Sequence, residues 1–169
     1  MNPLTADAIR ASLINTSKRE RTQATLPDLD IIRWDRLDLL GWIDPKRPQL
    51  AYVVLEHEGT PTGIMLRTNE PSARRRRKAV CSWCEDVIET DDVSMYVARR
   101  AGAPGRRGDS IGTLICTDFR CSRNVRRQPT ESEVFSNDED DKEMYRQLRI
   151  AGLQERSSRF VNRVLGASG

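Results

Sequence analysis

The sequence predicts an α+β protein in which β-hairpins form the centre and helices flank them. Runs of β-branched and aromatic residues, typical of strands, lie in the middle of the chain. Stretches with apolar residues at helical spacing stand towards both ends. Two closely spaced cysteine pairs bracket part of the strand-rich region. These observations together favour one domain, which we place at residues 5–166.

Composition and charge limit the kinds of function that the protein can have. The 169 residues are 37% hydrophobic and 31% charged, so the chain is polar but can bury a modest core. Its formal net charge is only +3, which does not by itself indicate a nucleic-acid-binding protein. The charge is unevenly placed, because residues 67–127 carry 14 basic and 8 acidic residues while residues 128–143 carry seven acidic residues and one lysine.

The chain lacks the segments expected of membrane or exported proteins. No apolar run approaches the roughly 18 residues that span a membrane. The opening residues, MNPLTADAIR, contain no apolar stretch typical of a secretion signal. We therefore expect a cytoplasmic protein that does not bind membranes.

The first elements are predicted from apolar spacing. Residues 5–17 are expected to form a short helix, because Ile9 and Leu13 recur at helical spacing. Residues 30–42 mix apolar and charged positions, and we expect part of this segment to be helical, ending at Gly41.

Two hairpins are predicted in the centre. The clearest strand covers residues 49–58, and residues 64–68 return after a longer loop that contains glycine and proline. Residues 93–99 alternate well and pair in our prediction with residues 111–116. The segment AGAPGRRGD between them predicts a mobile loop.

The C-terminal third is predicted to be helical. Residues 118–127 form a short helix that Pro129 ends, and residues 140–166 form a helical segment. The apolar stripe changes phase near Gly152, which predicts a kink or two helices. The acidic stretch 136–141 is interpreted as a flexible tether, with folding back against the arginines as the alternative.

The four cysteines have the spacing of a structural zinc site. Cys81 and Cys84 form a C-x2-C pair, and Cys116 and Cys121 form a C-x4-C pair after 31 intervening residues. Tetrahedral zinc takes four thiolates, and a C-x2-C turn places two sulfurs without strain. A knuckle, a hairpin and then a helix that begins with the last ligand is the treble-clef arrangement, which we place at residues 79–128. Four protein ligands close the site to water, so we interpret the zinc as structural.

Other uses of the cysteines are less favoured. Disulfides are rare in a chain without an export signal. A C-x2-C redox motif belongs to a βαβ pattern, which this sequence does not show. Unrelated buried thiols remain an alternative.

The cysteine region resembles a known family. The segments CSWCEDV and VSMYVARRAGAPGRRGDSIGTLICTDFRCSRNVR, with LDLLGWIDPKRPQLAYVV and GIMLR upstream, are similar to the treble-clef domain of elongation factor G-binding, fusidic-acid-resistance (FusB-type) proteins. In particular, the chain resembles their shorter actinobacterial relatives, the FBP-domain proteins, and the resemblance covers about residues 5–166. It implies a non-enzymatic protein that binds elongation factor G and helps to release it from the ribosome when fusidic acid stalls it. It also implies that zinc is held through Cys81, Cys84, Cys116 and Cys121.

The basic segments are candidate contacts for an anionic partner, either an acidic protein face or RNA phosphate. The alternative is that they are simply solvated. The candidate partner-binding residues are Arg74, Arg75, Arg76, Arg77, Lys78, Arg106, Arg107, Arg123 and Arg127. If zinc folds the module, we expect these segments to converge on it. The leading hypothesis is a binding module for elongation factor G or the ribosome, and the alternative is an RNA- or DNA-binding zinc-finger protein.

Several residues receive structural rather than catalytic interpretations. Trp83 and Phe119, each between two cysteines, are expected to pack in the core. His57 is the only histidine, and we expect it to be hydrogen-bonded in or beside a sheet. Acidic residues after the first cysteine pair, including Glu85 and Asp86, are interpreted as surface charge. Without a catalytic histidine partner or an open metal site, no enzyme activity and no small-molecule substrate are expected.

Overall fold

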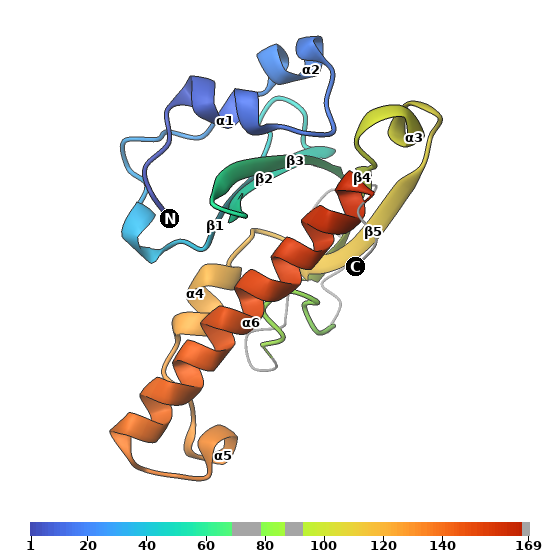
Figure 1. Cartoon of the computed structure of the whole chain (residues 1–169). Coiled ribbons are helices and arrows are strands. Elements are labelled where there is room, and N and C mark those ends of the chain that lie inside the picture. Colours follow the sequence, from blue (N-terminus) through green and yellow to red (C-terminus); the bar gives the residue numbers. More distant parts are fainter. Residues whose placement is uncertain (69–78, 87–92, 167–169) are drawn as a thin grey trace.

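A five-stranded antiparallel sheet organises the part of the chain that the structure describes, which is residues 1–68, 79–86 and 93–166 of the computed structural model (Figure 1). The strands follow one another in sequence order across the sheet. They are β1 (Leu39–Ile43), β2 (Leu50–His57), β3 (Thr60–Arg67), β4 (Val93–Arg99) and β5 (Ser110–Cys116). The predicted α+β class, with hairpins between helices, is confirmed.

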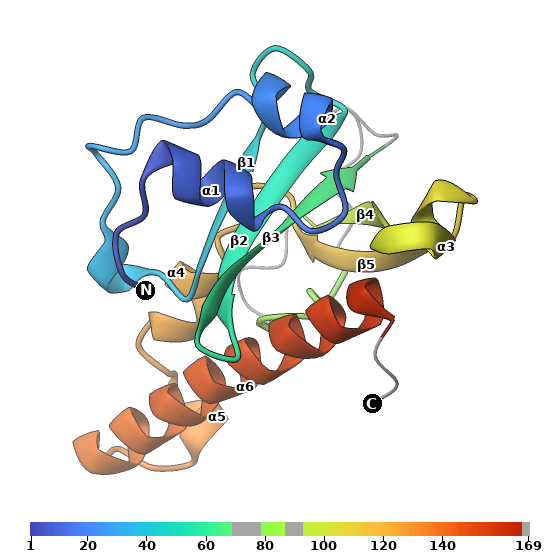
Figure 2. The same ribbon diagram turned by 45° about the horizontal axis from the view of Figure 1, so that its top comes forward.

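Helices cover both faces of this sheet. The two N-terminal helices lie over one face and the long last helix crosses the other (Figures 1 and 2). The helical elements are α1 (Ala6–Ser12), α2 (Lys18–Gln23), the 3-10 turn η1 (Trp34–Arg36), α3 (Gly102–Arg106), α4 (Cys121–Arg126), α5 (Glu131–Val134) and α6 (Glu139–Leu165).

The central strands are buried on both sides, because the two helical layers each form a core with one face. Ala51 and Val53 of β2 pack on the α6 side, while Tyr52 and Val54 pack on the α1 side. Successive residues of a strand point to opposite faces, so a strand covered on both faces is apolar throughout. This explains why AYVVL was the clearest strand signal in the sequence.

The segment after α1 takes part in the sheet. The predicted helix over residues 5–17 ends early, at Ser12, and Ile14 then donates its N–H to the Gly63 carbonyl at 2.9 Å. The side chain of Asn15 exchanges two hydrogen bonds with the backbone of Met65 in β3, at 2.8 and 3.0 Å. The same amide also donates to the Arg99 carbonyl in β4, at 3.0 Å. Asn15 therefore joins β3 to β4, two strands that pair at Arg67 and Val97.

The prediction that a helix within residues 30–42 ends at Gly41 is wrong, because the end of this segment belongs to a strand. After the short turn η1, residues 39–43 form β1 and pair with β2 from Leu39–Leu55 to Ile43–Ala51. Leu39 faces the α6 core while Leu40 faces the α1 core, which is the period of a strand. The three-residue spacing of apolar residues in the sequence is also typical of a helix. Pairing with β2 makes the segment a strand.

Both hairpin connections differ from the prediction. β2 and β3 are joined by a tight turn at Glu58 and Gly59, which both have positive φ, rather than by a longer loop. The segment predicted as a mobile loop contains α3. The backbone N–H of Arg107 closes the end of this helix by donating to the carbonyls of Ala103 and Pro104.

The last helix is continuous and runs without a sharp bend in Figures 1 and 2, so the expectation of a kink or two helices near Gly152 is wrong. A Cβ at Gly152 would lie 2.8 Å from the guanidinium of Arg156, so the glycine makes room for that side chain. The change of apolar phase has another cause. Leu153 and Phe160 pack in the core, whereas Met144 and Leu148 lie on the exposed N-terminal half of α6.

Replacing Gly41 of β1 with alanine is expected to destabilise the protein by about 2 kcal/mol, as overpacked cores do. The added Cβ would lie 2.3–2.6 Å from side-chain atoms of the buried Phe119, so the ring must move. Urea denaturation measures the loss. Gly112→Ala is the matched control, because its Cβ would meet the flexible Met95 side chain at 3.1 Å. An equal effect of both substitutions would contradict this explanation.

Candidate metal centre

Three elements bring the four cysteines together. Cys81 and Cys84 stand in a turn before β4, Cys116 is the last residue of β5, and Cys121 is the first residue of α4. All four are buried, and their sulfur atoms lie within 4.8 Å of one another. The predicted strand end and helix start at the second pair are thus observed.

The sulfur spacing fits a tetrahedral ion. The Cys81–Cys121 and Cys84–Cys116 sulfur pairs are 3.6 and 3.7 Å apart. Four zinc–sulfur bonds of about 2.3 Å at tetrahedral angles place sulfurs about 3.8 Å apart. A disulfide needs about 2.05 Å, and the four thiols are free.

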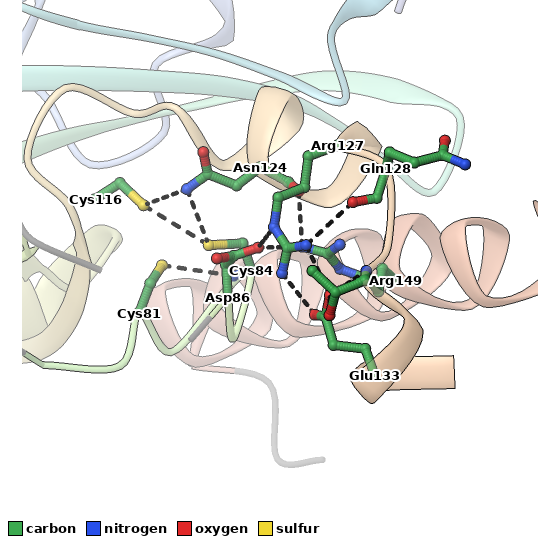
Figure 3. Close-up of polar contacts among 10 residues, drawn as sticks. Cys81, Cys84, Asp86, Cys116, Asn124, Arg127, Gln128, Glu133 and Arg149 are labelled. Carbon is green, nitrogen blue, oxygen red and sulfur yellow. Dashed lines mark hydrogen bonds and ion pairs between the residues drawn. The ribbon is translucent and has the colours of Figure 1, made fainter. Parts of the chain in front are cut away.

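Hydrogen-bond donors surround the sulfurs. The N–H groups of Trp83 and Cys84 point at the Cys81 sulfur, at 3.4 and 3.5 Å. The side-chain amide of Asn124 lies 3.5 Å from the Cys116 sulfur and 3.8 Å from the Cys84 sulfur (Figure 3). Such donors stabilise thiolates and orient metal ligands. Sequence reasoning missed Asn124, although its place three residues after Cys121 puts it on the same side of α4.

The pKa values of the four thiols are also consistent with a bound cation. Hydrogen bonds from Cys116, Cys121 and Cys84 lower the pKa of Cys81. Hydrogen bonds with Cys116, Cys81 and Cys84 raise the pKa of Cys121. Hydrogen bonds from Cys116 and Cys121 likewise lower the pKa of Cys84, so the thiols of the first pair ionise more readily than that of Cys121. A bound divalent cation would stabilise all four cysteines as thiolates, and zinc is such a cation.

Asp86, two residues after Cys84, connects the cysteine turn to three helices. Its buried carboxylate accepts from Arg127 of the α4 end at 2.7 Å and also from Arg149 of α6. Arg149 in turn donates to the Asn124 carbonyl at 2.7 Å. Arg127 also makes a two-pronged pair with Glu133 of α5, at 2.6 and 2.8 Å (Figure 3). The interpretation of Asp86 as surface charge is wrong, because its side chain is 1% exposed.

A second set of contacts fastens α6 to the cysteine turn. Arg156 donates to the Trp83 carbonyl at 2.7 Å and pairs with Glu85 at 2.9 Å. The Trp83 ring lies 5.6 Å from the Phe160 ring. The expected core positions of Trp83 and Phe119 are confirmed, since they are 2% and 6% exposed.

The expectation for the single histidine is also confirmed. His57 is buried at the end of β2, and its Nδ1 lies 2.6 Å from the Ser158 hydroxyl of α6.

The structure separates the predicted partner-binding arginines. The run Arg74–Lys78 lies outside the described residues. Arg106 and Arg107 are exposed at α3, at the outer end of the β4–β5 hairpin, whereas Arg123 is exposed on α4. Figures 1 and 2 place these two helices on opposite sides of the molecule, so the expected convergence is not seen between them. Arg127 is half-buried in the ion pairs with Asp86 and Glu133.

The acidic connector is not a free tether. Asp138 caps the N-terminus of α6 by accepting from the Asp140 N–H at 2.7 Å, and α6 begins at Glu139. Carboxylates in a first helical turn are favoured by the helix dipole. The acidic residues of this stretch therefore start a helix, and the preceding Glu133 folds back onto Arg127.

Substitution of Glu133 with glutamine is expected to destabilise the protein by about 1–3 kcal/mol at pH 7. The Arg127 guanidinium lowers the pKa of Glu133 from 4.5 to about 2. A lowered carboxyl pKa stabilises the fold above about pH 4.5, and this stabilisation is lost as the pH falls through about 2. Urea midpoints of both proteins should therefore converge between these pH values. Glu131→Gln, exposed on the same short helix, is the control; a gap that is independent of pH would contradict the assignment.

None of the described helices is long and apolar enough to cross a membrane.

Comparison with known proteins gives one match. A family model described as FBP C-terminal treble-clef zinc-finger matches residues 8–164. No curated protein and no solved structure matches the chain. The family description and the buried four-sulfur cluster agree on a structural zinc ion.

Proposed function

The chain belongs to the FBP C-terminal treble-clef zinc-finger family, and from this premise we propose that it is a non-enzymatic zinc protein that binds elongation factor G or the ribosome. In this role it acts in the cytoplasm and modulates release of the translation factor. The family is a binding-type domain, which favours recognition over catalysis.

The observation that carries the proposal is the buried cysteine cluster with Asp86 beside it. A single buried centre holds the cysteine turn, the β4–β5 hairpin and α4 in one geometry. Asp86 extends this rigid unit to α6 through Arg149. Four sulfur ligands fill the coordination sphere of zinc, so the ion shapes the unit and has no place for an activated water.

Exposed arginines on this unit supply the recognition chemistry. Arg106, Arg107 and Arg123 are exposed on helices that the unit holds in place. Guanidinium groups in fixed positions favour carboxylates and phosphates, because they present paired donors. Binding promotes release of a factor when the protein prefers one of its two conformations, since only a difference in affinity shifts such an equilibrium.

The test is a pull-down of purified elongation factor G by the zinc-loaded protein, with ribosomal RNA as competitor and at two salt concentrations. Retention of the factor despite RNA supports the proposal, and release of the factor from fusidic-acid-stalled ribosomes is then measured. Loss of the factor with capture of RNA, weakening steeply with salt, favours the alternative of an RNA-binding zinc finger. Capture of neither contradicts both.

A charge-reversed pair makes the test specific. Arg106→Glu with Arg107→Glu is expected to weaken binding about tenfold at low salt, because like charges then face the partner. Arg19→Glu with Arg159→Glu makes the same charge change at exposed positions on α2 and α6 and is the matched control. Equal weakening by both pairs would indicate only a general charge effect.

A further inference from the structure

A groove of about 600 Å³ lies beside the zinc unit, between the segment leading into β1 and helix α4. Its walls come from residues 32–40 on one side and residues 123–127 on the other. These two segments are far apart in the sequence, and no sequence pattern predicted a cavity between them. A volume of this size is typical of clefts that bind a ligand or a few side chains of a partner.

The floor of the groove is apolar. Ile32 and Leu37 are half-buried and pack against the α1-side core, and Leu40 belongs to that core. The groove is therefore an opening onto the hydrophobic core. Apolar surface at the bottom of a cleft favours an apolar side chain from outside, because both surfaces then leave water.

The rim of the groove is basic. Five arginines line it, and none of the lining residues among the described parts of the chain is acidic. They are Arg33, Arg36, Arg123, Arg126 and Arg127. The first three are exposed. Because Arg127 already pairs with Asp86 and Glu133, the three exposed arginines are the charges that complement a negatively charged ligand.

The arginines differ in how firmly they are held. Arg126 pairs with the buried carboxylate of Asp38, so its guanidinium is fixed at the groove edge. Arg33 pairs at 3.2 Å with Asp35, and both of these side chains are largely exposed. Exposed ion pairs contribute little stability, so an incoming carboxylate can replace Asp35 at low cost.

We propose that this groove binds an acidic segment of a partner protein, with a leucine or phenylalanine side chain on the apolar floor and flanking carboxylates on the arginines. The inference rests on the proposed function in that the chain is a protein-binding module, and it names the chemistry that the partner presents. Nucleic acid fits less well. Single-stranded bases stack on aromatic side chains, and the lining residues among the described parts of the chain are aliphatic, arginine or asparagine.

The direct test uses a fluorescein-labelled probe peptide, Glu-Asp-Glu-Leu-Phe-Asp-Glu-Leu, and the zinc-loaded full chain. Anisotropy measures affinity, and methyl NMR signals of Leu37 and Leu40 report where the peptide lies. We expect both methyl groups to shift, and a peptide with serine in place of leucine and phenylalanine to bind about tenfold more weakly. A peptide that does not bind the wild-type chain, or that leaves these methyl signals unchanged, overturns the proposal.

Variants test the two parts of the groove separately. Arg33→Glu with Arg36→Glu should weaken peptide binding about tenfold, while Arg19→Glu with Arg159→Glu should not. Ile32→Ser should weaken peptide binding about threefold. Ile31→Ser should not, because the exposed Ile31 is the neighbouring residue and does not line the groove. Zinc content and melting temperature verify that each variant is folded. Wild-type affinity in the Arg33–Arg36 variant contradicts the proposal.

The outcomes separate this inference from the proposed function. If elongation factor G binds the wild type and the Arg33–Arg36 variant equally well, the proposed function is supported. The groove is then not the docking site for the factor. Peptide binding at the groove, together with failure to bind the factor, supports the groove and contradicts the proposed function. An RNA oligomer that shifts the Leu37 and Leu40 signals and displaces the peptide overturns the acidic-segment proposal.

Discussion

Cys84→Ser is expected to lose zinc and to unfold the treble-clef module, which we predict at residues 79–128. A neutral serine hydroxyl is a much weaker zinc ligand than a thiolate, so only three of the four ligands that a structural zinc site needs would remain. Metal binding and folding are coupled in such modules, and structural zinc contributes about 10–16 kcal/mol in zinc-finger peptides. That range equals or exceeds the net stability of a typical domain, about 5–15 kcal/mol.

Two measurements check this expectation. Zinc content by mass spectrometry should fall to near zero, and tryptophan fluorescence should shift to the red because Trp83 leaves its buried position beside Phe160. Ser82→Ala is the control, since Ser82 is the exposed residue of the same turn. If the Cys84 variant keeps both its zinc and its melting temperature, the four cysteines do not form the metal site.

Asp86→Asn is expected to destabilise the protein by about 3–5 kcal/mol while the protein keeps its zinc. The substitution removes the negative charge that faces both Arg127 and Arg149. Arg127 keeps its pair with Glu133, but the largely buried guanidinium of Arg149 loses its Asp86 partner. Breaking a buried ion pair from one side is costly for this reason, whereas losing an exposed pair costs about 0–1 kcal/mol.

The adjacent Glu85 offers a matched control for Asp86. Glu85 pairs with Arg156 at 2.9 Å, but its side chain is 56% exposed. Glu85→Gln should therefore lower the free energy of unfolding by less than about 1 kcal/mol in urea denaturation. Similar losses for the two variants, or loss of zinc by Asp86→Asn, would show that Asp86 does not act as a separate connector.

The cysteine site and most strands could be predicted because their signals are local. The C-x2-C spacing and the alternation in residues 93–99 each lie within a few residues, and the chemistry of zinc or of a pleated strand acts at that range. β1 could not be distinguished from a helix, because its short apolar run fits both periods until it pairs with β2.

The surroundings of the site escaped prediction because they depend on distant residues. Asp86 meets Arg149, 63 residues later, and Asp38 meets Arg126, 88 residues later. A charged residue in a polar stretch looks the same in the sequence whether it faces water or a buried guanidinium. The groove has the same origin, because its floor and its α4 wall become neighbours only after folding.

The hydrogen bonds of Asn15 to Met65 have a consequence for the behaviour of the protein when the metal is lost. At these positions the backbone N–H and C=O groups of β3 form hydrogen bonds with the N-terminal segment of the chain, and not with the zinc-held hairpin. An unpaired strand edge is a template for other chains and leads to aggregation. We therefore expect this stretch of β3 to stay covered when the β4–β5 hairpin opens, and we expect Asn15 to limit edge-to-edge association of the metal-free protein.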